Sequence, residues 1–224
     1  MRKSILKLAT MSVAMSAMAM SVPAFAQDAA AEEASGPITV SGGAALVSDY
    51  RFRGVSLSDK GFALQPYLTV KHESGFYVGA WASNLSENDG DDAEVDLYVG
   101  FSGGEELTYD IGATYYVYPG VSSFNYFEVT GKLGSTVGPA TVGAQLSYVP
   151  SQDNTGNTDN VYVATNASIA LPDSPISIVG SIGIEDGAFT AGSDKLDWTL
   201  GLTANVAGFT LGASYVDTNR RSVF

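Results

Sequence analysis

From residue 38 onward, apolar side chains recur at every second position in stretches of about ten residues. In residues 93–102 the odd positions are Ala, Val, Leu, Val and Phe, and the even positions are Glu, Asp, Tyr, Gly and Ser. Residues 107–118, 140–147 and 196–205 repeat this pattern. A period of two is that of a β-strand with one apolar and one polar face. The sequence therefore predicts an all-β chain.

The connectors between these stretches differ in length in a regular way. The predicted strands cover residues 38–55, 62–72, 76–85, 93–102, 107–118, 124–135, 140–150, 159–171, 176–185, 195–206 and 208–217. Tight connectors such as 73–75 and 207–208 mostly alternate with longer polar ones such as 86–92, 151–158 and 186–194. A soluble sandwich has no reason to sort its loops in this way. We expect an antiparallel transmembrane β-barrel of about 12 strands, eleven recognisable and the last, within 219–224, short.

The amino terminus has the features of a secretory signal peptide. Arg2, Lys3 and Lys7 precede an apolar stretch over residues 8–22, and an Ala-Phe-Ala site ends at Ala26. Cleavage after Ala26 is expected, with an uncleaved anchor as the alternative. The predicted organisation is a signal peptide (1–26), a flexible acidic tail (27–37) and an outer-membrane barrel (38–224) in a Gram-negative bacterium.

Composition argues against several classes of function. The formal net charge of −13 argues against binding to nucleic acid, which needs clustered bases. The absence of Cys excludes thiolate metal sites and disulfides, and one His leaves little for other metals. No cofactor is expected. The expected partners are outer-membrane lipids and lipopolysaccharide, the barrel-assembly machinery and small hydrophilic solutes.

Aromatic residues gather at the ends of the predicted strands. One group next to the long loops comprises Tyr50, Phe52, Phe62, Tyr116, Tyr118, Phe124, Tyr148 and Tyr162, and another next to the tight turns comprises Phe76, Phe101, Tyr109 and Phe209. Two bands separated by a strand length fit the aromatic girdles at the membrane interfaces. Burial in a core is the alternative interpretation.

Charged residues within the strands occupy the polar face, which in a membrane barrel faces the lumen. The predicted lumen-lining residues are Asp49, Arg51, Arg53, Lys71, Glu94, Asp96, Asp110, Glu128, Lys132 and Asp197. They could line a pore in which positive and negative side chains oppose each other. They could equally form a salt-bridged plug that fills a narrow barrel.

Two other groups of residues admit a chemical interpretation. His72, Glu73 and Ser74 invite comparison with outer-membrane lipid A deacylases, but they lie at a tight turn, where solvation alone is enough to explain them. The acidic loop with Glu87, Asp89, Asp91 and Asp92 could hold Ca²⁺ or Mg²⁺, but the spacing of a calcium loop is absent. We assign no catalytic or metal-binding residue.

Several ordered motifs point to one family. Residues 48–56 (SDYRFRGVS) with 58–61 (SDKG), 72–79 (HESGFYVG), 81–84 (WASN), 94–98 (EVDLY) and 115–120 (YYVYPG) closely resemble those of the TorF-type porin family of proteobacteria. The resemblance covers roughly residues 41–128 and implies an outer-membrane β-barrel without an agreed substrate. Members usually continue to a full last strand, so the short end of this chain departs from their pattern.

The expected function is a porin-like channel for passive diffusion of small hydrophilic solutes, weakly selective for cations. A barrel with a plugged lumen is the structural alternative, and a lipid A deacylase is the enzymatic one. No enzyme activity is predicted.

Overall fold

In the computed structural model, which describes residues 36–88, 91–190 and 192–220, one antiparallel sheet contains most of the chain. Its strands are β1 (Ile38–Val47), β4 (Ala63–His72), β5 (Phe76–Asn88), β6 (Asp91–Gly103), β7 (Leu107–Val117), β8 (Tyr126–Val137), β9 (Ala140–Val149), β10 (Asn160–Ala170), β11 (Ile176–Gly187), β12 (Lys195–Val206) and β13 (Phe209–Thr218). Each strand pairs with its neighbours in chain order, so the sheet is a continuous meander of hairpins. The all-β, antiparallel prediction is confirmed.

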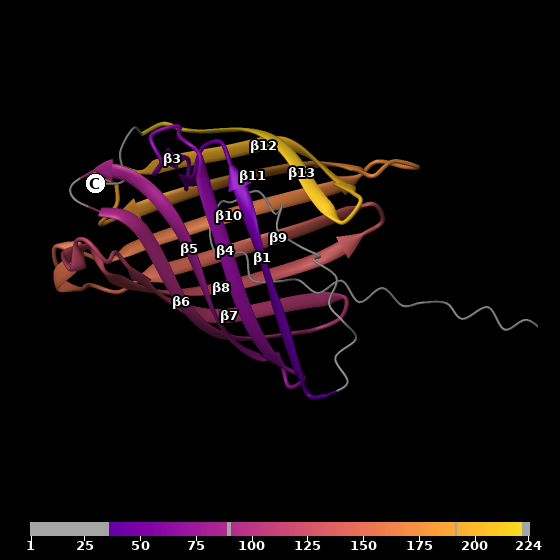
Figure 1. The fold of residues 1–224 in the computed structure, drawn as a ribbon, viewed down its shortest axis with the longest axis horizontal. Helices are drawn as coiled ribbons and strands as arrows, with labels where there is room; N and C mark the ends of the chain where they lie inside the picture. The colour runs from indigo at the N-terminus through magenta and orange to yellow at the C-terminus, as the bar shows by residue number, and fades with distance from the viewer. Residues whose placement is uncertain (1–35, 89–90, 191, 221–224) are drawn as a thin grey trace, which may run out of the picture.

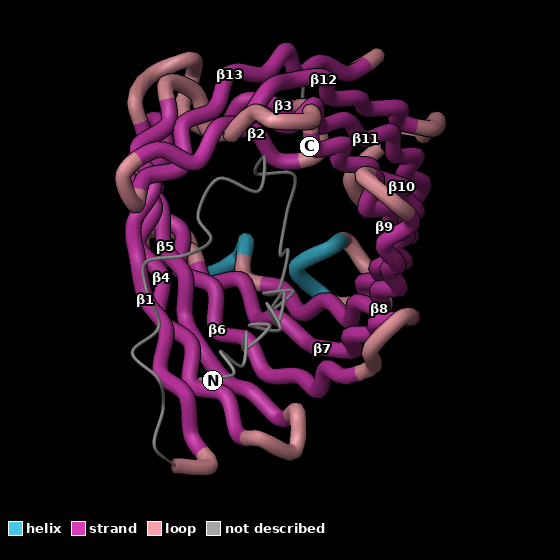
Figure 2. The backbone as a smooth tube through the Cα atoms, turned by 90° about the vertical axis from the view of Figure 1, so that its right-hand side faces the viewer, coloured by secondary structure: helices cyan, strands magenta, loops and turns pink. Residues whose placement is uncertain are grey.

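The sheet curls around an interior, as the view along its axis shows (Figure 2). β1 and β13 form its two edges, and no strand pairing joins them within the described residues. Residues 219 and 220 follow β13 without strand structure. Most of the segment expected to form a twelfth strand, and the predicted signal peptide with most of the acidic tail, lie outside the described residues.

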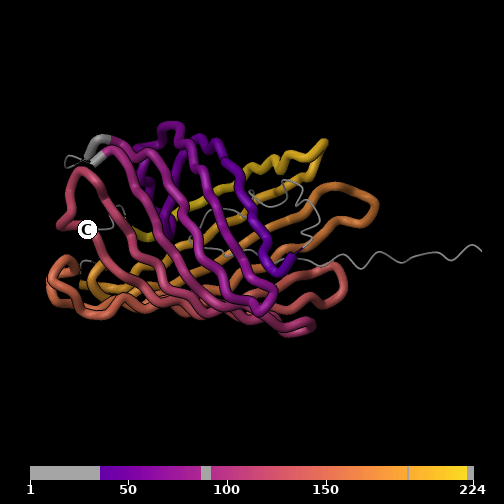
Figure 3. The backbone as a smooth tube through the Cα atoms, turned by 60° about the horizontal axis from the view of Figure 1, so that its bottom comes forward, coloured from indigo at the N-terminus to yellow at the C-terminus, as the bar shows by residue number. Residues whose placement is uncertain are grey.

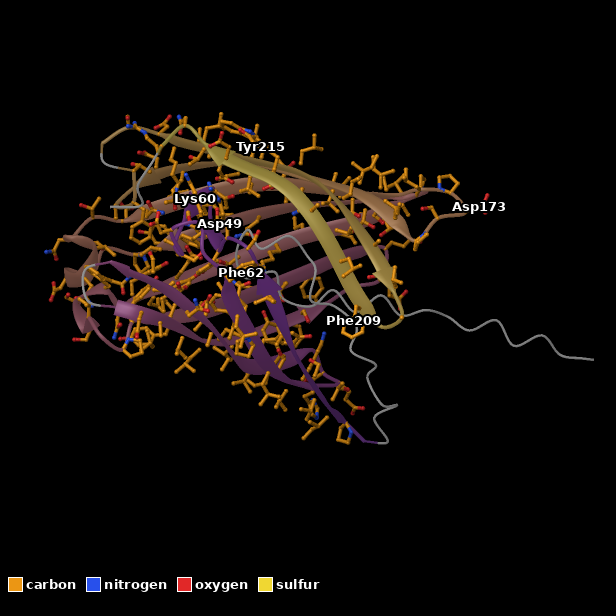
Figure 4. All side chains as sticks on the ribbon, turned by 45° about the horizontal axis from the view of Figure 1, so that its top comes forward. Asp49, Lys60, Phe62, Asp173, Phe209 and Tyr215 are labelled. Atoms are coloured by element: carbon orange, nitrogen blue, oxygen red, sulfur yellow. The ribbon has the colours of Figure 1, made fainter. Side chains whose placement is uncertain are left out.

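The connections alternate between the two ends of the barrel (Figures 1 and 3). At one end are tight turns, such as residues 73–75 between β4 and β5 and 207–208 between β12 and β13. At the other end are longer segments, two of which contain the 3₁₀-helices η1 (Ser122–Phe124) and η2 (Asp153–Thr155). Figure 4 shows Asp173 at the tip of a tight turn, with Asp49 and Lys60 toward the long-loop end. One predicted long loop, 86–92, is wrong, because β5 and β6 extend through it to a pair between Asn88 and Asp91.

The outer face of the sheet is apolar and exposed. More than half of the surface is accessible on Leu46, Leu64, Leu97, Ile111, Leu133, Leu146, Ile182, Leu200 and Leu211. A chain folding in water would bury such a continuous apolar surface, whereas lipid solvates it. No helix among the described residues is long and apolar enough to cross a membrane.

The connection between β1 and β4 has an unexpected course. It contains a small antiparallel hairpin of β2 (Arg51–Phe52) and β3 (Val55–Ser56), which lies beside β12 and β13 (Figures 1 and 2). The predicted strand 38–55 is therefore too long, since β1 ends at Val47. The chain turns back at Arg53 and Gly54, both of which have positive φ.

Candidate functional site

The inner face of the barrel carries most of the predicted lumen-lining residues. Glu94 and Asp96 lie on β6, Glu128 on β8 and Asp197 on β12, and all four are buried. Lys71, Asp110 and Lys132 lie on β4, β7 and β8 nearer the tight turns and are only partly buried. Side chains alternate between the two faces of each strand, so the charged residues and the exposed apolar residues lie on opposite faces of the sheet.

Asp49, Arg51 and Arg53 do not belong to a wall strand, and the prediction that they alternate along one is wrong. They lie in the connection between β1 and β4, with Arg51 in β2 and Arg53 at the turn of the hairpin. A short hairpin and a long strand both alternate polar and apolar residues, so the sequence pattern could not distinguish them. Arg51 forms an ion pair with Asp49 at 2.6 Å that stays partly exposed.

Arg53 links the hairpin to two strands of the wall. Its guanidinium pairs with Glu128 of β8 at 2.5 Å and with Glu185 of β11. Glu185 also pairs with Lys195 of β12. Burial lowers the pKa of Arg53, but Glu128 and Glu185 outweigh it and hold that pKa well above its ordinary value. The guanidinium therefore stays charged and ties the hairpin to the wall.

Aromatic rings flank the Arg53 guanidinium. Its central carbon lies 4.2 Å from the centroid of the Tyr162 ring and 4.7 Å from that of Phe52. These are cation–π distances, and the desolvated setting strengthens the attraction. Charge and ring stacking thus act together on one side chain that is 2% exposed.

Gly54 lets the hairpin sit closely against the end of β13. Its φ of +86° lies in the left-handed region, which side chains disfavour. A Cβ atom at this position would lie 2.6 Å from Cβ of Thr218 and 2.8 Å from the carbonyl oxygen of Asp217. Glycine is therefore required by both the backbone and the neighbouring strand.

Tyr50 anchors the beginning of the same connection. Its hydroxyl donates to Glu94 at 3.3 Å, and its ring centroid lies 5.4 Å from that of Trp81. The Tyr50 backbone N–H donates to Oγ of Ser58 at 2.8 Å. Burial, together with the negative charges of Glu94 and Asp96, raises the pKa of Tyr50 well above its usual range. The hydroxyl remains a donor at any physiological pH.

Of the two predicted aromatic bands, one lies on the outer face, whereas half of the other is buried inside the barrel. At the tight-turn end, Phe76, Phe101, Tyr109 and Phe209 are exposed on the outer face, which fits a girdle. At the other end, the girdle interpretation is wrong for Tyr50, Phe52, Tyr116 and Tyr162, which are buried inside the barrel. Tyr116 stacks on Tyr126 with ring centroids 4.3 Å apart, and Tyr126 meets Phe189 edge to face at 5.0 Å. These rings pack the interior around the hairpin.

Glu185 and Lys195 are interior residues that sequence reasoning missed. Both are fully buried, and they face each other across β11 and β12. Each lies at the end of a predicted strand, where the alternation stops. The alternation could have identified both as inward residues. Glu185 directly follows Ile184, which faces outward, and Lys195 lies two positions before Asp197, which faces inward.

The tight-turn half of the interior is polar and more exposed than the half around the hairpin. Lys71 donates to Oγ of Ser102 at 2.7 Å, and the Tyr77 hydroxyl donates to Asp110 at 3.0 Å. Lys71, Ser102 and Asp110 are partly exposed. The interior is therefore polar and more exposed to solvent at the tight-turn end, which makes it the wetter half, and it is packed with aromatic rings and buried ion pairs around the hairpin.

The remaining candidate groups have simple surroundings. His72 and Ser74 are exposed at a tight turn, with Nδ1 of His72 and Oγ of Ser74 2.9 Å apart. Within the described residues no carboxylate hydrogen-bonds to His72, as a catalytic triad would require. Of the acidic loop, Asp89 and the side chains of Glu87 and Asp91 lie outside the described residues. In the part described, no three His, Asp or Glu side chains converge to hold a metal.

Comparison with known proteins gives one family and one solved structure. A family model described as a bacterial protein of unknown function (Gcw_chp) matches residues 31–224. No curated protein matches the chain. A solved structure entitled "Structure of porin refined at 1.8 angstroms resolution" is 15% identical, with a TM-score of 0.42. The similarity covers 70% of this chain and 57% of that porin chain, so the match spans little more than half of the porin's length.

Proposed function

We propose that this chain, which belongs to the bacterial Gcw_chp family of unknown function, is an outer-membrane barrel through which small hydrophilic solutes diffuse. The observation that carries this proposal is the division of the sheet into an exposed apolar outer face and a charged interior. An apolar belt is what lipid requires, and a polar interior is what a water-filled path requires. Export by a signal peptide cleaved after Ala26 would bring the chain to this membrane.

The path narrows where the connection between β1 and β4 enters the interior. Arg53 spans from the hairpin to β8 and β11, so this level admits at most small solutes. The wetter half near the tight turns would form a vestibule on the periplasmic side.

Interior charge supports a weak preference for cations. Among the described residues, the interior and the hairpin connection carry seven acids and five bases, a net charge of −2. The acids are Asp49, Glu94, Asp96, Asp110, Glu128, Glu185 and Asp197, and the bases are Arg51, Arg53, Lys71, Lys132 and Lys195. A narrow path with net negative walls concentrates cations and repels anions, most strongly at low salt.

Conductance of the refolded protein in a planar bilayer tests this function. We expect small single-channel steps and a reversal potential of cationic sign in a salt gradient. Replacing Arg51 and Arg53 with Gln should strengthen the cation preference, because two positive charges leave the path. Anion selectivity, or no response to this change, would show that these residues do not border the conducting path.

A barrel closed by its own hairpin is the second candidate, favoured by one observation. The network of Arg53, Glu128, Glu185 and Lys195 is almost completely buried, as a permanent plug would be. A plugged barrel would give no current with the native sequence, whatever the salt. Current that appears only after Arg53→Gln would identify the hairpin as the plug. A plugged barrel would act by stabilising the envelope or by presenting its loops.

A further inference from the structure

Two neighbouring acids on β6 have an unusual setting. Glu94 and Asp96 occupy successive inward positions, and each is 1% exposed. Glu94 accepts a hydrogen bond from the Tyr50 hydroxyl. The Asp96 side chain lies against that of Glu94, and within the described residues no N–H or hydroxyl group donates to either of its carboxylate oxygens. A buried carboxylate without a donor is strongly disfavoured unless another positive group compensates it.

Among the described residues, the two buried cations, Arg53 and Lys195, form ion pairs with other acids. Arg53 is directed to Glu128 and Glu185, and Lys195 pairs with Glu185. In the strand register Asp96 lies between Trp81 of β5 and Tyr116 of β7. The Tyr116 hydroxyl donates to Glu128.

Water can approach this position from the tight-turn side. The next inward residues in that direction, Tyr98 on β6 and Thr114 on β7, are partly exposed. Asp96 thus lies where the wetter half of the interior meets the packed hairpin. A small ion arriving through the vestibule would meet this carboxylate first at the narrow level.

We propose that Glu94 and Asp96 bind a small, hard metal cation such as Ca²⁺, with the Tyr50 hydroxyl as a further oxygen ligand. Carboxylate and hydroxyl oxygens are the ligands that such cations prefer. No third acid completes a cage in the described structure, so binding is weak and the ion is exchangeable. Weak binding suits a permeating ion, which must both enter and leave the site. This role in permeation rests on the proposed channel function.

Terbium luminescence in the refolded full chain tests the site directly. Tb³⁺ substitutes for Ca²⁺ and emits when a nearby Trp is excited. Trp81 lies directly opposite Asp96, whereas the only other tryptophan, Trp198, is on β12. We expect saturable emission on Tb³⁺ titration that Ca²⁺ displaces, and loss of that emission in Trp81→Phe with Ca²⁺ binding unchanged by calorimetry.

The acidic residues provide matched variants. Asp96→Asn and Glu94→Gln should each weaken Tb³⁺ and Ca²⁺ binding at least tenfold. Asp110→Asn, which removes an inward acid from the neighbouring strand nearer the tight turns, should leave it unchanged. Heat-modifiable gel migration confirms that each variant folds, and Glu94→Gln decides the question if Asp96→Asn does not fold.

The outcomes separate this site from the channel function. The site is overturned if the native protein does not bind Tb³⁺, or if Asp96→Asn binds it as tightly as the native protein. In that case a proton shared by Glu94 and Asp96 accounts for the burial of both carboxyl groups. Cation-selective current without Tb³⁺ binding rejects the site and leaves the channel. Binding without current supports the site and rejects the channel, leaving a cation held in a plugged barrel.

Discussion

Replacement of Arg53 by Gln should destabilise the barrel far more than replacement of Arg51, two residues away on the same hairpin. Arg53 forms two buried ion pairs with β8 and β11, whereas Arg51 forms one partly exposed pair with its neighbour Asp49. The two substitutions remove the same charge from the same segment. The difference between their effects on stability therefore reports the burial of Arg53 and its ion pairs with β8 and β11 rather than the loss of a charge alone.

The structure sets the size of the effect. Without Arg53, Lys195 still compensates Glu185, but Glu128 loses the only ion pair that it forms within the described residues while remaining 3% exposed. Breaking a buried pair by removing one partner costs about 3–5 kcal/mol, because a charge is left buried without compensation. The Arg51–Asp49 pair, whose side chains are 22% and 20% exposed, remains in contact with solvent, and ion pairs that water screens contribute about 0–1 kcal/mol. We expect Arg53→Gln to lower the free energy of unfolding by about 3–5 kcal/mol and Arg51→Gln by less than about 1 kcal/mol.

Urea titration of the protein refolded into lipid vesicles measures both values. The double variant Arg53→Gln with Glu128→Gln provides the control, since it removes the orphaned carboxylate as well. It should recover much of the stability lost in Arg53→Gln. Equal effects of the two arginine substitutions, or no recovery in the double variant, would refute the bridge from the hairpin to β8.

Three further predictions concern the wall, the hairpin and the amino terminus. Leu97→Arg should destabilise the barrel in vesicles by about 2–4 kcal/mol and Thr114→Arg should be tolerated, because only Leu97 faces lipid; equal urea midpoints would contradict the register. Gly54→Ala should lower the free energy of unfolding by at least about 1–2 kcal/mol, because Gly54 has a positive φ and lies close to β13. Gly131→Ala should not, because a Cβ atom at Gly131 would meet no atom within 4 Å. Mass spectrometry of the protein from outer-membrane fractions should show a chain that begins at Gln27, and an intact amino terminus would indicate an anchor.

The sequence by itself determined the strands, because the information needed for them is local. Side chains on a strand alternate between two faces, so the apolar positions of residues 107–118 or 196–205 reveal both the strand and its lipid-facing side. The inward positions of Glu94, Asp96, Glu128 and Asp197 follow from the same parity. Connector lengths likewise show which strand ends lie together.

Only the tertiary structure decided the course of residues 48–62. Alternation assigns two faces to a segment but does not say what each face contacts, so the positions of Tyr50, Phe52 and Arg53 fitted a wall strand as well as a hairpin. The partners that distinguish the two are far away in the chain. Tyr50 meets Glu94 44 residues later, and Arg53 meets Glu128 and Glu185 after 75 and 132 residues. Such contacts exist only once the sheet has curled and brought β6, β8 and β11 around a common interior.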